Sequence, residues 1–114
     1  MDFLPGDQIE LPFFVEQIND DGTTETIDIS EVSGVMYETK NPGRIVKVYK
    51  HDTEDAPTQV DAKTVLFTIT SADTLKCRPG FEYSFDVWVG NIKQTFLGIL
   101  GVCGDSPIKN IVHE

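Results

Sequence analysis

The sequence predicts an all-β protein, built as one antiparallel β-sandwich of about seven short strands. Apolar and polar residues alternate with a period of two almost throughout, which is typical of strands with one buried face. Turn-forming residues recur at the spacing found in sandwiches. The chain has 114 residues, of which 39% are hydrophobic, enough for a single core. We therefore expect one domain over residues 1–114, with residues 104–114 as a C-terminal tail.

Residues 7–16 (DQIELPFFVE) form the first expected strand, because every second residue from position 9 onward is apolar. Pro12 within this segment lacks an amide hydrogen, which suits a strand at the edge of a sheet. Residues 20–22 (DDG) predict a turn, and the alternation resumes over residues 27–29.

The middle of the chain predicts two further strands joined by a tight turn. Residues 34–40 (GVMYETK) alternate again, and residues 41–43 (NPG) have the composition of a turn. Residues 44–50 (RIVKVYK) follow as a strand. Residues 51–60 are polar and aperiodic, which predicts a loop, and residues 61–70 (DAKTVLFTIT) are rich in β-branched and aromatic residues typical of strands.

The last third predicts one helical turn and a hairpin. Residues 71–75 (SADTL) can form a single turn of helix that Ser71 caps. Beyond it, residues 81–89 and 93–103 are two strands joined by Gly90 and Asn91, and Gly-Asn is suited to a two-residue type II′ turn. Three glycines at positions 98, 101 and 104 of the second strand indicate a bulge or a close backbone approach.

This turn predicts which residues of the hairpin lie opposite one another. The expected core-facing pairs are Val89 with Ile92, Phe85 with Phe96, Tyr83 with Gly98, and Phe81 with Leu100. The expected pairs on the other face are Trp88 with Lys93, Asp86 with Thr95, Ser84 with Leu97, and Glu82 with Ile99. The second face therefore carries an apolar streak of Trp88, Leu97 and Ile99, with Lys93 placed for a cation–π contact with the indole.

Two interpretations of this streak are open. In the first, the C-terminal tail folds over it through Ile108, Ile111 and Val112. In the second, it is a contact surface for another subunit, since exposed apolar patches with polar rims commonly mark interfaces. The candidate interface residues are then Trp88, Lys93, Leu97 and Ile99.

The charge balance points away from nucleic acid and membranes. The net charge is −10, and residues 1–39 carry ten acidic side chains and no basic one. Such a surface repels nucleic acid and favours either solubility or a basic partner. No apolar run approaches the roughly 20 residues of a membrane span, and the N-terminus does not resemble a signal peptide. We expect the chain to remain in the compartment where it is made.

No catalytic or metal-ligating pattern stands out. The two histidines, His51 and His113, have no spacing typical of a nucleophile–base pair or a zinc site. We expect Cys77 and Cys103 to be unpaired thiols. The acidic loops at residues 20–28 and 52–55 lack the ladder of an EF-hand, which leaves a loosely bound divalent ion open as an alternative. The sequence therefore predicts neither an enzyme nor a cofactor.

Three segments resemble one family. They are residues 5–11 (PGDQIEL), residues 27–35 (IDISEVSGV), and residues 71–89, which include the run Pro79-Gly80-Phe81, Tyr83, Asp86 and Val87. In this order they resemble the immunoglobulin-like domain at the N-terminus of bacteriophage upper baseplate proteins and of related small virion proteins. The resemblance implies an immunoglobulin-like antiparallel sandwich.

The resemblance also implies a structural, non-enzymatic role in a virion, as a tail, baseplate, neck or head component made in the cytoplasm of the bacterial host. Such a component would form a homo-oligomer and dock onto neighbouring virion proteins, without a cofactor, nucleic acid or membrane. Two other functions remain open. One is an acidic inhibitor or binding module that occupies a basic site on a host protein. The other is a small carbohydrate-binding sandwich that uses Trp88 as a stacking platform.

Overall fold

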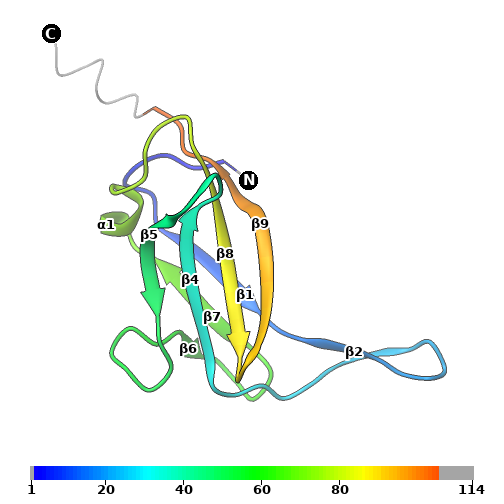
Figure 1. Ribbon diagram of the computed structural model, residues 1–114. Coiled ribbons are helices and arrows are strands. Elements are labelled where there is room, and N and C mark those ends of the chain that lie inside the picture. The colour runs from blue at the N-terminus through cyan, green and yellow to red at the C-terminus, as the bar shows by residue number, and fades with distance from the viewer. Residues whose placement is uncertain (1, 106–114) are drawn as a thin grey trace, which may run out of the picture.

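The computed structural model describes residues 2–105 and consists almost entirely of antiparallel β-sheet (Figure 1). The strands are β1 (Ile9–Phe13), β2 (Glu16–Ile18), β3 (Thr24–Thr26), β4 (Val32–Glu38), β5 (Asn41–Tyr49), β6 (Thr58–Gln59), β7 (Val65–Ile69), β8 (Glu82–Val89) and β9 (Ile92–Val102), with the helical turn α1 (Ser71–Thr74) before β8. They form sheets of order β5-β4-β8-β9, β1-β7-β6 and β2-β3. In residues 2–105 no helix is long and apolar enough to cross a membrane.

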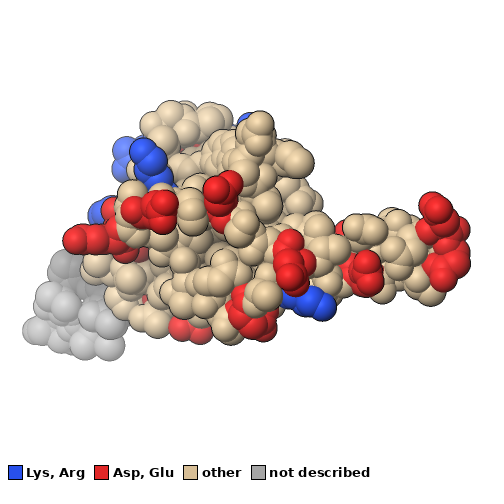
Figure 2. Space-filling view, turned by 90° about the horizontal axis from the view of Figure 1, so that it is seen from below, with Lys and Arg blue, Asp and Glu red and all other residues tan. Residues whose placement is uncertain are grey.

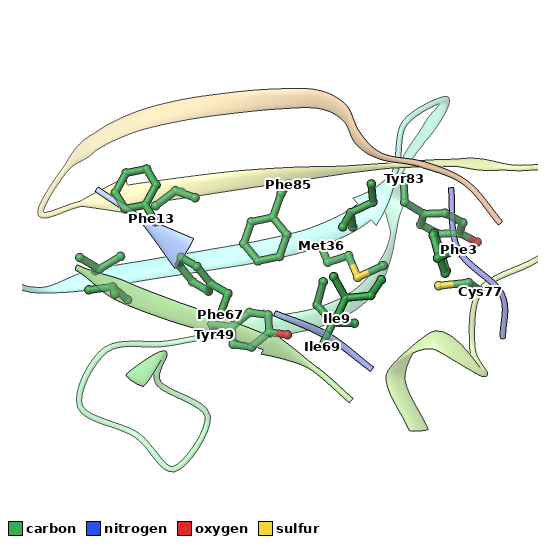
Figure 3. Packing of buried hydrophobic residues seen from close by; sticks show 14 of the residues in the cluster. Phe3, Ile9, Phe13, Met36, Tyr49, Phe67, Ile69, Cys77, Tyr83 and Phe85 are labelled. Carbon is green, nitrogen blue, oxygen red and sulfur yellow. The ribbon is translucent and has the colours of Figure 1, made fainter. Parts of the chain in front are cut away.

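The core lies between the four-stranded and the three-stranded sheet (Figure 3). Phe67 of β7 and Phe85 of β8 face each other with ring centres 4.9 Å apart, and Tyr49 of β5 packs 5.3 Å from Phe67. The Tyr49 hydroxyl donates to the carbonyl of Thr68 at 2.7 Å, which satisfies the polar end of a buried ring and links the two sheets. Phe13 of β1 packs edge-on against Phe67.

Gly34 of β4 makes room for this aromatic contact. A Cβ atom at this position would lie 2.7 Å from a ring carbon of Phe67 and 2.7 Å from one of Phe85. Both distances are below van der Waals contact and both neighbours are buried rings, so the missing side chain is a packing requirement of the core. The expected strand over residues 34–40 is present as β4.

The expected hairpin turn at residues 90–91 is confirmed. Val89 pairs with Ile92, Gly90 has a φ of 61°, and Asn91 has a negative φ, as a type II′ turn requires. The helical turn is also present, but Thr70 caps it in place of Ser71. The Thr70 hydroxyl accepts from the amide of Asp73, and the Asp73 carboxylate accepts from the amide of Thr70 in return.

The turn expected at residues 41–43 is wrong. The chain reverses at residues 39–40, where Glu38 pairs with Asn41, and β5 already begins at Asn41. Pro42 and its neighbours form a bulge between this pair and that of Tyr37 with Ile45. Proline is tolerated there because β5 is the edge strand of its sheet.

Other boundaries also differ from the expected ones. The predicted loop over residues 51–60 contains the short strand β6, because Thr58 and Gln59 pair with β7. Residues 27–29 form no strand, although the amide of Ile27 donates to the carbonyl of Val15. The position of Pro12 in an edge strand is confirmed, since β1 pairs with β7 alone.

Candidate functional site

The predicted contact between Trp88 and Lys93 is confirmed. The two residues lie opposite each other on β8 and β9, and the Lys93 ammonium nitrogen is 5.9 Å from the centre of the indole ring. Trp88 is half-buried, not fully exposed as expected. A sugar ring stacked on this face of the indole would have to displace Lys93, so the geometry gives no support to a carbohydrate platform.

Asp86 ties this outer face of the four-stranded sheet together. Its carboxylate accepts a hydrogen bond from the Tyr37 hydroxyl at 2.9 Å and lies 3.8 Å from the Lys93 ammonium. Burial and the neighbouring Asp86 carboxylate raise the pKa of Tyr37 above its usual value. The hydroxyl therefore stays protonated and keeps donating to Asp86 throughout the neutral range.

The expected register is confirmed in one half of the hairpin and wrong in the other. The confirmed pairs run from Val89 with Ile92 to Phe85 with Phe96. Beyond them, Tyr83 pairs with Gly101 and Glu82 with Val102, in place of the expected Gly98 and Ile99. Phe81 precedes β8 and is 37% exposed, so it is not the core residue opposite Leu100 that the register predicted.

A bulge in β9 causes this shift. Residues 97–100 of β9 lie opposite the single residue Ser84 of β8. Gly98 and Gly101 both have a positive φ, of 64° and 71°, which glycine adopts without a steric penalty. The Ser84 hydroxyl accepts the amide hydrogen of Gly98 at 2.8 Å, so the bulged backbone is anchored to β8. The strand glycines had indicated a bulge, and that prediction is confirmed.

The bulge separates the residues of the expected apolar streak. Trp88 and Lys93 remain on the outer face of the sheet, whereas Ile99 lines a cavity together with the core residues Phe85 and Phe96. Leu97 is 71% exposed and Ile99 is 39% exposed. The prediction of one continuous streak is therefore wrong, because four extra residues turn Ile99 toward the space between the sheets. The tail residues Ile108, Ile111 and Val112, which were expected to cover it in one interpretation, lie outside the described residues.

This space is an apolar groove between the edge strands β1 and β9, here called the edge groove. It consists of two cavities of about 230 and 210 Å³, which share Phe13 and Val87 in their walls. Asp28 is the only charged residue among those that line the two cavities. At its rim, Phe14 is 50% exposed and Ile92 is 77% exposed. Sequence reasoning missed the groove, because it lies between strands that are far apart in the sequence.

The β2–β3 hairpin, here called the arm (residues 16–26), projects away from both larger sheets (Figure 1). The arm carries four acidic residues and no basic one, and they mark its far end in Figure 2. Ile18 is its one large apolar residue and is 77% exposed. The tip is ordered by its own contacts, since Asp21 accepts hydrogen bonds from the amide and hydroxyl of Thr23 at 2.9 and 2.6 Å. These bonds lower the pKa of Asp21, which therefore remains charged.

A second acidic feature, the Glu38 cluster, lies near the β4–β5 turn and is fully buried. The Glu38 carboxylate accepts two hydrogen bonds from the Arg78 guanidinium and one from Asn41 at 2.8 Å, and Arg44 approaches it to 2.9 Å. The Arg78 contact holds the pKa of Glu38 down to about 2 although burial opposes the shift. Tyr83 completes the cluster, and its hydroxyl accepts the backbone amide hydrogen of Arg78 at 2.7 Å. All these polar groups are used to join one segment of the fold to another.

The remaining candidate groups form no reactive site. Cys77 and Cys103 are both buried and free, which confirms that they are unpaired, and burial raises the pKa of Cys77 to about 12. Within residues 2–105 no three metal-ligating side chains come together, so neither acidic loop forms a cluster. His51 is on the surface beside Asp52, at 3.8 Å, and His113 lies outside the described residues.

Comparisons with family models, with curated proteins and with solved structures found no match to this chain. The residues described above are therefore the evidence from which its function is inferred.

Proposed function

We propose that this chain is an immunoglobulin-like β-sandwich that acts as a non-catalytic assembly domain. It packs against copies of itself and against neighbouring structural proteins of a bacteriophage virion, after synthesis in the host cytoplasm. The observation that carries the proposal is the edge groove, an open apolar channel with Phe14, Ile92 and Ile99 exposed at its rim. A rim of this kind is costly to leave in water and typical of a protein contact.

Two details support the immunoglobulin-like part of the proposal. The hydrogen bond from the Arg78 amide to the Tyr83 hydroxyl joins the start of a strand to the backbone a few residues upstream, like the tyrosine corner of immunoglobulin sandwiches. Two of the segments that carry the resemblance also meet, because the Thr74 hydroxyl accepts from the amide of Gly6 and donates to the carbonyl of Asp7. The motif residues thus support one another across 67 positions of the chain.

Of the four candidate interface residues, Leu97 and Ile99 fit this proposal best. Both are exposed beside the edge groove, whereas Trp88 and Lys93 satisfy each other on the outer face. We assign the assembly contact to the edge groove and treat the outer face as a second, weaker candidate.

Size-exclusion chromatography with light scattering tests the proposal. The purified full chain should show a mass above that of the monomer, rising with concentration. Ile99→Ser should abolish this association while the chain stays folded, and Trp88→Ala on the outer face is the matched control that should retain it. A monomer at every concentration up to the millimolar range would exclude self-assembly. Loss of association only with Trp88→Ala would transfer the contact to the outer face.

The acidic binding module remains a second candidate because of the arm. Four acidic residues on a projecting hairpin match a basic protein surface in charge, and charge complementarity of this kind chiefly sets partner choice and association rate. Affinity for a basic partner that falls steeply with added salt, in a chain that is itself monomeric, would favour this function over assembly.

A further inference from the structure

The arm and the edge groove each lack something that the other has. The arm is a two-stranded hairpin, and such a hairpin is marginally stable in water unless a third strand or an apolar surface supports it. β2 and β3 pair only with each other, so the outer edge of each carries unpaired backbone groups. The arm projects from the body, which leaves this edge without a neighbour (Figure 1).

The edge groove has the complementary deficit. β9 pairs only with β8, so the backbone of its regular part, from Ile92 to Phe96, has a free edge along the groove. Free edges of this kind accept an added strand from another chain. The cavity beside it, lined by Phe14, Phe96 and Ile99, is apolar and open.

Charge indicates which strand this edge accepts. β9 contains one basic residue, Lys93, and no acidic one, whereas the arm contains Glu16, Asp20, Asp21 and Glu25 and no basic one. The cavity lined by Ile99 has no charged residue in its wall. An acidic arm therefore meets no like charge in this cavity and one opposite charge on β9, while two arms paired with each other would place eight acidic side chains together.

We propose that the arm of one copy docks along the edge groove of a second copy, with its backbone beside β9 and Ile18 in the cavity lined by Phe14, Phe96 and Ile99. This inference rests on the proposed assembly function and names its contact. It gives the hairpin a third strand, covers the exposed rim, and places an isoleucine that is 77% exposed in an apolar cavity. The acidic face of the arm stays in water.

Cross-linking between two singly substituted chains tests the contact directly. Chains with Ile18→Cys are mixed with chains with Ile99→Cys and oxidised, and we expect a disulfide-linked pair that contains one chain of each kind. The native thiols of Cys77 and Cys103 are buried, so the introduced thiols are the accessible ones. Val48→Cys is the matched control, because Val48 is 50% exposed but belongs to β5, the strand at the far edge of the same sheet from β9. It should give no specific pair with Ile18→Cys.

A second measurement gives the strength of the contact. Ile18→Asp should weaken self-association of the full chain by roughly ten- to a hundredfold, the loss expected for one buried isoleucine side chain. Lys93→Glu should weaken it by a smaller factor. Both residues are exposed, so the folded state should be retained, and circular dichroism checks this.

The outcomes separate this inference from the proposed function. A full chain that associates, but forms no Ile18–Ile99 cross-link and is insensitive to Ile18→Asp, overturns the arm contact and leaves assembly standing. A chain that is monomeric throughout overturns both. A cross-link within one chain between Ile99→Cys and Ile111→Cys would show that residues 106–114 fill the groove, and would also overturn the arm contact.

Discussion

The Glu38 cluster and the arm both concentrate carboxylates, and they use them in opposite ways. Glu38 is fully buried and is held by Arg78, Arg44 and Asn41. The four carboxylates of the arm lie on a hairpin that pairs only with itself, and no salt bridge is found for them within residues 2–105. A carboxylate that is removed from water needs cationic partners, so the buried one is part of the fold, whereas the exposed ones are free to act on a partner.

The largest effect should come from removing the buried carboxylate. Glu38→Ala should lower the free energy of unfolding by about 3 kcal/mol, the lower end for a buried ion pair that loses one partner, because Arg78 and Arg44 are partly exposed and can be hydrated. The same change at Glu25 of the arm should alter it by less than about 0.5 kcal/mol. Urea unfolding measures both. Equal effects at the two positions would remove the distinction between the two regions.

Gly34 connects the closed core to the open groove, because the two rings it accommodates, Phe67 and Phe85, also line the groove. Gly34→Ala should lower the free energy of unfolding by about 1–3 kcal/mol, as expected for overpacking a core. Gly43→Ala is the control, since a Cβ there meets no atom within 4 Å and its φ is not positive. If the two variants are equally stable, the rings move apart at little cost and the groove is not fixed by core packing.

Acid should remove the contribution of the Glu38 cluster. The pKa of Glu38 is about 2 in the folded chain and near its ordinary value of 4.5 in the unfolded chain. Its stabilisation is therefore complete above about pH 4.5 and is lost as the pH falls toward 2. The difference in unfolding free energy between the wild type and Glu38→Ala should shrink over this window in urea titrations. A difference that stays constant from pH 6 to pH 2.5 would contradict the assignment.

The smallest effect should come from the arm tip. A chain with Asp20→Asn and Asp21→Asn should unfold at the same urea concentration as the wild type, because neither side chain contacts the larger sheets. A clear loss of stability would show that the arm packs on the body of its own chain, and would weaken the case that it reaches for another.

Local chemistry was sufficient to predict the features that depend on a few neighbouring residues. Gly90 and Asn91 formed the expected two-residue turn, Pro12 marked an edge strand, and the glycines of β9 marked a bulge. The turn at residues 41–43 was predicted wrongly because a side-chain contact from Asn41 to Glu38 and a bulged edge strand moved the reversal by two residues. Turn residues alone do not distinguish these two registers.

The candidate site was predicted only in part. Trp88 and Lys93 were paired correctly because they lie within a few residues of the turn, where the register has no room to slip. Ile99 was placed on the wrong face because the bulge intervenes, and alternation cannot say how many residues a bulge absorbs. One extra residue reverses the side on which all later side chains lie.

The amino-acid sequence by itself determined an all-β chain, the hairpin at residues 90–91, two unpaired thiols and an acidic first third without a base, since each follows from composition or from residues close together. Only the tertiary structure decided that Glu38 meets Arg78 across 40 positions, that β1 and β9 leave a groove between them, and that the arm stands apart. The physical reason is that these features depend on how the sheets pack. Packing joins residues far apart in the chain, to which no local pattern is sensitive.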